Sequence, residues 1–131
     1  MMASHTVGTV LQDLKGRLDG IAAALVARDG SVLYADLPVG VFAETFSVMC
    51  AAIVGAGVTA HGELRRAPPE RIVVDGADSR TVIVCAGTGT ILVVVVQLSM
   101  DLSKVFGEIG KFAGLLDIGE RSLPDDLRGR G

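Results

Sequence analysis

The sequence predicts an α+β sandwich in which a small antiparallel sheet lies between helices. Residues 91–97 are apolar at almost every position. Such a strand must be covered on both faces, because a strand with one face in water alternates apolar and polar residues. The separators at 76–79 and 87–89 are too short for a helical crossover, so the strands they join should form antiparallel hairpins. Segments of helical periodicity precede, divide and follow the strands.

The first predicted element is an amphipathic helix. Its apolar face follows the i, i+3, i+4, i+7 spacing and consists of Val7, Val10, Leu11, Leu14 and Leu18. Ser4 or Thr6 is the expected N-cap, and Gly20 is the expected end.

A hairpin should follow this helix. Residues 21–28 and 31–36 are compatible with strands, and Asp29-Gly30 between them suits a two-residue turn because both residue types tolerate positive φ. Several alanines weaken the β propensity of the first strand, so the turn carries much of this prediction.

A long helix is predicted over about residues 41–64. Its main periodic residues are Phe42, Phe46, Met49, Ile53, Gly57 and Leu64, and the adjacent small residues are Thr45, Ala52, Gly55, Ala56 and Thr59. Small residues let another helix approach closely, and each glycine costs about 1 kcal/mol of helix propensity relative to alanine. The sheet or a second subunit should therefore cover this helix. Residues 45–62 carry no charge, but their polar and glycine residues indicate a helix buried between protein surfaces and not a membrane span.

The second half of the chain predicts a three-stranded meander and a last helix. The strands are residues 71–75, 80–86 and 90–98, with the third in a central position. The helix is periodic from Leu102 to Leu116, with Ser99 or Asp101 as its N-cap. We expect a single domain at 1–118 and a mobile tail at 119–131, where charges, Pro124 and glycines leave little to pack.

The composition narrows the classes of function. A net charge of −3 at pH 7 argues against nucleic-acid binding. Cys50 and Cys85 lie in apolar runs without a second ligand nearby, which indicates small buried side chains in a reducing compartment and no structural zinc. The first twenty residues lack a signal-peptide core. We expect a cytoplasmic protein without a metal or cofactor and without direct membrane insertion.

The sequence contains no catalytic motif in the structural context that its chemistry requires. None of the three lysines follows the glycine pattern of a phosphate-binding P-loop, so the chain should not hydrolyse GTP itself. Residues 55–60 match GxGxxA but lie within a helical pattern, and residues 87–90 join two strands and so form a turn. Cys50 and His61 would be separated by about 16 Å of helix rise. We therefore expect a protein that is not an enzyme.

The pattern resembles the roadblock domains, a family that includes dynein light chains, lysosomal adaptor subunits and a bacterial gliding-motility GTPase regulator. The resemblance covers roughly residues 6–116. It rests on the element order, the turn Ala27-Arg-Asp-Gly30, the Ala- and Gly-rich long helix, and the apolar strand 91–97 before the final helix. It implies a five-stranded antiparallel sheet with the first and third helices on one face and the second on the other.

The resemblance also implies a dimer and a partner. Family members commonly pair the second helix and third strand with a second copy, and here the implied residues are Phe42, Phe46, Met49, Ala52, Gly55, Ala56, Thr59, Ile72 and Val73. The family binds small Ras-like GTPases or resembles domains that do, and the charges we single out for a partner are Glu44, Glu63, Arg65 and Arg66. Members that stimulate hydrolysis are thought to remodel the GTPase's own switch regions, so no catalytic residue is transferred. The alternative is a structural adaptor that pairs with another roadblock-like protein. An enzyme or ligand sensor has no residue constellation behind it.

Overall fold

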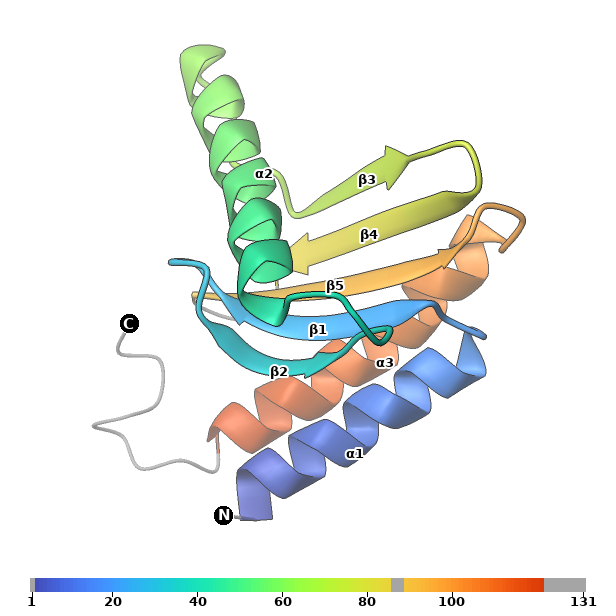
Figure 1. Ribbon diagram of the computed structural model, residues 1–131. Helices are drawn as coiled ribbons and strands as arrows, with labels where there is room; N and C mark the ends of the chain where they lie inside the picture. Colours follow the sequence, from blue (N-terminus) through green and yellow to red (C-terminus); the bar gives the residue numbers. More distant parts are fainter. Residues whose placement is uncertain (1, 86–88, 122–131) are drawn as a thin grey trace.

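A five-stranded antiparallel sheet separates one long helix from a pair of helices (Figure 1). The computed structural model describes residues 2–85 and 89–121, with side chains placed for residues 7–85 and 89–112. The elements are α1 (Met2–Arg17), β1 (Ala22–Ala27), β2 (Val32–Asp36), α2 (Ala43–Glu63), β3 (Arg71–Asp75), β4 (Ser79–Cys85), β5 (Thr90–Gln97) and α3 (Leu102–Arg121). The strand order is β2-β1-β5-β4-β3, and α2 lies on the face opposite α1 and α3. The predicted element order and the central position of the strand at 90–98 are confirmed.

The central strand β5 is covered on both faces, as its sequence predicts. Leu92, Val94 and Val96 belong to the core cluster that packs against α1 and α3. Ile91 and Val93 belong to the cluster that packs against α2. All five side chains are fully buried. The uninterrupted β-branched run therefore follows from a sheet with helices on both sides.

A row of side chains across the sheet explains the alanines of β1. The strand registers align Ala35, Ala24, Val93, Ile83 and Ile72 across all five strands, and these residues pack in the cluster beneath α2. The side chains enlarge from β2 toward β3. The alanines leave room for α2 over β1, where Ala24 is fully buried. Close packing of the helix thus outweighs the weak β propensity of alanine.

The helix caps confirm one prediction and correct another. Asp101 is the N-cap of α3, because its Oδ1 accepts a hydrogen bond of 3.1 Å from the backbone N–H of Ser103. The expected caps of the first helix were wrong: α1 begins at Met2, so Ser4 and Thr6 lie inside it. At its other end α1 stops at Arg17, and Asp19 rather than Gly20 has a left-handed φ of 48°.

The first hairpin has a longer turn than the predicted two residues. The backbone N–H of Ala27 donates to Ser31 O at 2.9 Å, so Arg28, Asp29 and Gly30 form the loop. Gly30 has a φ of +95°, which fits the left-handed residue of a three-residue turn. The Asp29 carboxylate accepts hydrogen bonds from the backbone and hydroxyl of Ser31. These bonds hold the pKa of Asp29 below its ordinary value.

Ser47 carries a fully buried hydroxyl on the sheet-facing side of α2. Its Oγ has no hydrogen-bond partner among the residues that the structure describes. A buried polar group without a partner costs about 1–3 kcal/mol in desolvation. We expect Ser47→Ala to raise the free energy of unfolding by about 1 kcal/mol, with a small further gain from helix propensity. Chemical denaturation measures this change, and a loss of stability would show that the hydroxyl is satisfied in the folded protein.

The last helix extends beyond the predicted periodic segment. α3 runs to Arg121, whereas the sequence pattern ended at Leu116. Residues 122–131 of the expected mobile tail lie outside the described residues. Val105, Ile109 and Phe112 are buried against the sheet and α1, and Arg71 places its guanidinium carbon 4.8 Å from the centre of the Phe106 ring. The latter contact connects α3 to the start of β3.

Candidate interaction surface

The long helix α2 is most deeply buried on the sheet in its first half. Its buried residues are Ser47, Cys50 and Val54, and no residue after Val54 in the helix is buried. Figure 1 shows the C-terminal end of α2 standing clear of the sheet. By length and composition alone α2 could cross a membrane, yet only 17% of its apolar stretch is buried in the fold. An apolar helix with so little cover is a candidate interaction surface.

The uncovered side of α2 forms a continuous stripe, which we call the outer face. It consists of Thr45, Val48, Met49, Ala52, Gly55, Ala56, Thr59, Ala60 and Glu63, all exposed. These positions recur at helical spacing on the side opposite Cys50 and Val54. Its middle carries small residues, and Val48 and Met49, near its first turns, are 49% and 54% exposed.

The two glycines in the middle of α2 have different environments. A β-carbon at Gly57 would lie 3.2 Å from Pro69 Cγ and 3.3 Å from Ile72 Cδ1, so the subunit's own packing accounts for this glycine. A β-carbon at Gly55 would have no neighbour within 4 Å among the described residues. A mid-helix glycine costs about 1 kcal/mol relative to alanine. The packing of a single chain gives no compensation at Gly55.

The open edge of the sheet continues the outer face. β3 is the last strand of the sheet, and within the described part of the chain its other edge has no strand beside it. Val73 and Val74 on this strand are 38% and 43% exposed. The contacts of Gly57 with Pro69 and Ile72 place this edge next to the C-terminal half of α2. We call the outer face and the free edge of β3 together the α2–β3 surface.

The structure separates the predicted dimer residues into two groups. Met49, Ala52, Gly55, Ala56 and Thr59 lie on the outer face, Phe42 is exposed just before it, and Val73 lies at the sheet edge. Phe46 and Ile72 instead pack against the core between α2 and the sheet. Sequence reasoning missed Val48, Leu64 and Val74, which are exposed and apolar. Val48 lies three residues after Thr45 and four residues before Ala52, and this helical spacing could have placed it on the same face.

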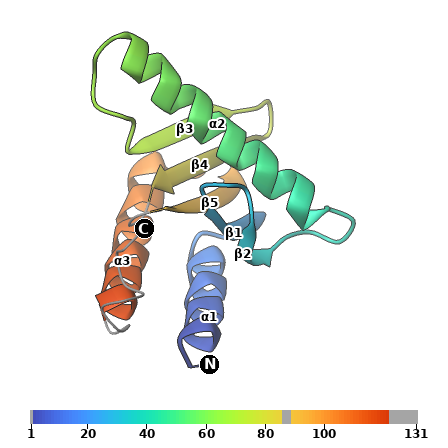
Figure 2. The same cartoon turned by 90° about the vertical axis from the view of Figure 1, so that its left-hand side faces the viewer.

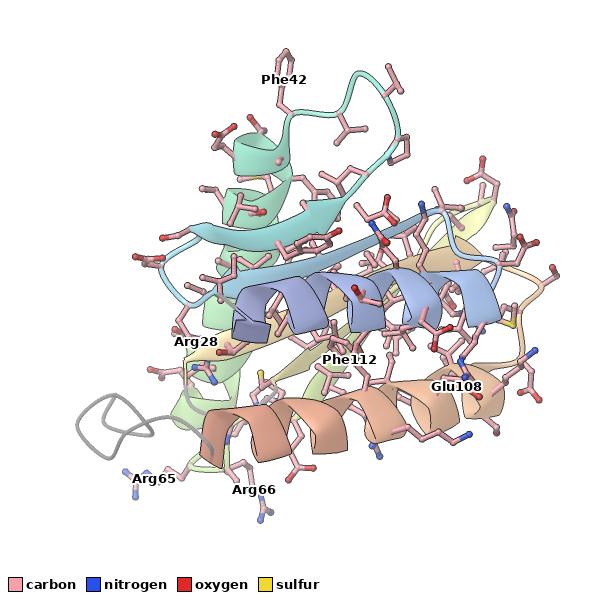
Figure 3. All side chains as sticks on the ribbon, turned by 90° about the horizontal axis from the view of Figure 1, so that it is seen from below. Arg28, Phe42, Arg65, Arg66, Glu108 and Phe112 are labelled. Carbon is pink, nitrogen blue, oxygen red and sulfur yellow. The ribbon has the colours of Figure 1, made fainter. Side chains whose placement is uncertain are left out.

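The four charges singled out for a partner are exposed but do not form one patch. Glu44 lies in the first turn of α2, whereas Glu63, Arg65 and Arg66 lie at its end. The helix between them spans about 30 Å. Figure 3 shows Phe42, which precedes Glu44 in the sequence by two residues, at one end of the helix and both arginines at the other. A partner that contacts all four charges must therefore extend along the whole helix.

A tight turn fixes the position of the two arginines. The backbone N–H of Arg66 donates to His61 O at 2.9 Å, and that of Arg65 donates to Gly62 O at 3.0 Å. Arg65 has a φ of +56°, a left-handed conformation more usual for glycine at this position. His61 Nδ1 donates to Ala67 O at 2.8 Å, which holds the following segment against the helix. Arg65 at the helix end therefore has a strained backbone conformation.

Cys50 and His61, the two side chains considered as a catalytic pair, have structural roles in the fold. Burial raises the pKa of the Cys50 thiol to about 11, so it stays protonated and unreactive at neutral pH. His61 lies eleven residues further along the same helix and donates to Ala67 O. Among the described residues, no group of three or more His, Cys, Asp or Glu side chains could hold a metal ion. The turn at 87–90 falls partly on residues 86–88, which lie outside the described part of the chain.

Asp75 forms an ion pair that closes the β3–β4 hairpin. Its Oδ1 accepts from Arg80 Nε at 2.7 Å, and its Oδ2 accepts from Arg80 Nη2 at 3.0 Å. The hydrogen bond to Arg80 holds the pKa of Asp75 below its ordinary value of 3.8. Because the folded-state pKa is the lower one, the pair stabilises the fold fully above pH 3.8, and this contribution is lost as the pH falls through the folded-state pKa.

This ion pair leads to a pH-dependent prediction. We expect Asp75→Asn to be less stable than the unsubstituted protein at neutral pH and the difference to shrink as the pH falls below 3.8. Urea unfolding across that range measures the difference. A stability difference that does not change with pH would mean that the charge of Asp75 does not contribute to stability.

A comparison with protein families identifies the fold. The model of the Roadblock/LC7 domain matches residues 7–96. The chain belongs to the Roadblock/LC7 family. The matched segment contains α2 and β3, and so the whole α2–β3 surface of this Roadblock/LC7 chain.

Individual relatives agree with this assignment. The uncharacterized protein MJ0714 of Methanocaldococcus jannaschii is 31% identical over 105 residues, which are 79% of this chain and 87% of that protein. MglB of Myxococcus xanthus superposes with a TM-score of 0.85 at 18% identity, covering 90% of this chain and 97% of the other. A structure described as MglB with tetrameric arrangement gives 0.79 at 22% identity, covering 92% and 93%. These similarities confirm the roadblock fold predicted from the sequence.

Proposed function

We propose that this Roadblock/LC7 chain is a non-catalytic dimeric module of the cytoplasm that binds a small Ras-like GTPase and regulates it or holds it in place. The observation that carries the proposal is the α2–β3 surface, where an apolar helix face without cover lies next to the open edge of a strand. A second copy would cover both features at once, because a two-fold axis brings identical patches together. Pairing of β3 with its copy would also remove an exposed strand edge.

Protein is a better cover for α2 than lipid. The inner side of the helix, with Cys50 and Val54, is docked on the subunit's own sheet. A spanning helix in this fold could not be surrounded by lipid without losing those contacts. Burial of exposed residues such as Val48 and Met49 would contribute on the order of 1 kcal/mol or more each, depending on the area covered. A dimer similarly gives a reason for the otherwise unexplained glycine at position 55.

The GTPase part of the proposal rests on family membership. Roadblock domains bind small Ras-like GTPases or resemble domains that do, and this chain is similar in fold to MglB over nearly its whole length. Both cysteines are free, which suits a reducing compartment. In this proposal the dimer contributes a binding surface, and the chemistry of hydrolysis stays with the GTPase.

The test is a capture experiment with matched nucleotide arms. The purified protein is immobilised and exposed to lysate of its source organism with excess GTP analogue or with GDP, and the bound proteins are identified by mass spectrometry. Enrichment of a Ras-like GTPase in one arm supports the proposal, and hydrolysis assays with that GTPase then give the sign of the effect. Recovery of roadblock-like or structural proteins alone, equally in both arms, would favour the adaptor function instead.

A further inference from the structure

A groove of about 550 Å³ lies between α1 and the edge strand β2, and its lining is mostly apolar. β2 is at the opposite edge of the sheet from β3. Within the described part of the chain no strand lies beyond β2. The dimer of the proposed function covers the edge at β3, so it leaves this second edge and its groove open.

A bulge in β2 contributes to this groove. Leu25 of β1 pairs with Tyr34 of β2. The next residue of β1, Val26, pairs with Val32, which leaves Leu33 as an extra residue in β2. A bulge of this kind changes the direction in which the side chain points. Leu33 lines the groove and is 54% exposed, so the edge strand presents an apolar side chain that the described part of the subunit leaves half uncovered.

Tyr34 forms a fixed wall of the same groove. A β-carbon at Gly8 would lie 2.8 Å from Tyr34 Cε1, so the ring approaches α1 this closely because position 8 is a glycine. Gln12 Nε2 donates to Tyr34 Oη at 2.9 Å, which holds the ring in place. The ring and Leu33 thus give an apolar side chain from elsewhere a surface to pack against.

A positive charge lies at one end of β2. Arg28, in the turn between β1 and β2, is exposed and forms no ion pair among the described residues. The neighbouring carboxylate of Asp29 accepts hydrogen bonds from Ser31 instead. Figures 2 and 3 show that α1 begins and α3 ends at the same end of the molecule, and Figure 3 shows Arg28 there.

We propose that residues 122–131, which follow α3, dock in this groove, with Asp125 and Asp126 next to Arg28 and Leu127 between Leu33 and Tyr34. Ten extended residues span up to about 33 Å. The segment starts at the end of the molecule that carries Arg28, and its two acidic residues come directly before a leucine. This order matches a path that meets the arginine first and the apolar groove next. The composition of the tail predicts mobility, and the proposal gives this stretch a fixed position.

The groove fits this segment better than it fits the β2 strand of a second copy. A bulged edge strand is a poor template for a regular ladder, because the extra residue interrupts the hydrogen-bond pattern. A short segment held by one ion pair and one apolar side chain needs no such ladder. A covered edge is also protected from pairing with other chains. The inference does not need the dimer, because the groove and the α2–β3 surface lie at opposite edges of the sheet.

The experiment follows Tyr34 in variants of the 131-residue chain. Tyr34 is the only tyrosine and the chain has no tryptophan, so tyrosine fluorescence reports on this groove alone. Acrylamide quenching measures access to the ring, and amide hydrogen exchange measures the opening of residues 32–36. The variants are Leu127→Asp, Arg28→Glu, Asp125→Arg with Asp126→Arg, and the last two sets combined. Lys104→Glu, an exposed charge reversal on α3, is the matched control.

We expect Leu127→Asp and each separate charge variant to increase quenching and to speed exchange at residues 32–36 about tenfold. The combined variant should recover both values, because it restores opposite charges with their signs exchanged. High salt should weaken the protection of the unsubstituted chain, because exposed charges are screened. Circular dichroism shows that each variant is folded, and the control should match the unsubstituted chain.

Three results would overturn the proposal. Unchanged quenching and exchange in Leu127→Asp would show that the segment does not occupy the groove. A combined variant without recovery would exclude the contact with Arg28. Protection that falls on dilution would assign the groove to a second copy of the chain. A monomeric unsubstituted chain would contradict the dimer of the proposed function and leave these readouts unaffected, so the two failures are distinguishable.

Discussion

Gly55→Trp is expected to weaken dimer formation strongly without harm to the fold of the subunit. Position 55 is exposed on the outer face, and a β-carbon there meets nothing within 4 Å among the described residues. The indole would therefore extend into solvent in a single chain. Across a close helix contact it would separate the two backbones, and overpacking of this kind costs about 1–3 kcal/mol for each inserted group. Two copies are inserted per dimer, so the dissociation constant should rise about a hundredfold or more.

Two tryptophan variants serve as controls for this result. Gly107→Trp places the same side chain on the exposed side of α3, where a β-carbon also has no described neighbour within 4 Å, and it should leave the dimer intact. Gly57→Trp would force the indole against Pro69 and Ile72, which lie within 3.3 Å of a β-carbon there. That variant should lose about 1–3 kcal/mol of folding stability. Light scattering gives the mass and urea unfolding the stability, and a Gly55→Trp protein that keeps its dimer mass would contradict the close helix contact.

Ala24→Leu is the substitution in the sheet from which we expect a large loss of stability. Ala24 is fully buried in β1, between Ala35 and Val93 in the row beneath α2. The added side chain would have to push α2 away from the sheet or leave its rotamer, at a cost of about 1–3 kcal/mol. Urea unfolding monitored by circular dichroism measures the loss, which we expect as a shift of the midpoint with an unchanged slope.

A reduction of side-chain size further along the same row is the matched comparison. Ile83→Val keeps the β-branched shape and removes one methylene group, and it should cost about 0.5–1.5 kcal/mol. Ile83 is fully buried. If Ala24→Leu were as mild as Ile83→Val, α2 would not be closely packed over β1, and the explanation of the alanines would be wrong.

The sequence predicted the elements well because the residue pattern of most elements records the environment of each of their faces. β5 shows its cover on both faces through its composition, and α3 shows its cap through Asp101. The division of α2 could not be predicted in the same way, because apolar or small residues occur all round this helix. Phe46 and Met49 looked equivalent by spacing, yet Phe46 packs inward and Met49 lies outside. Only the position of the sheet decides between them.

The local errors have physical causes of the same kind. The alanines of β1 were a weak strand signal because their reason is the closeness of α2, a feature that becomes visible only in three dimensions. The sequence has no typical capping residue before Met2, where α1 begins. The charges for a partner were chosen by proximity to one helix, but sequence proximity did not reveal that they lie at its two ends.

The weakly buried C-terminal half of α2 also affects the dynamics of the subunit. Residues 55–63 lack buried side chains of their own, so in a lone subunit the helix should open there by local fluctuations well below the free energy of global unfolding. Formation of the assembly would then order a segment as well as bury a surface. Amide hydrogen exchange should reveal this as protection of residues 55–63 that increases with protein concentration, while β5 stays protected at every concentration. The local stability of residues 55–63 would thus depend on whether the chain is a monomer or part of a dimer.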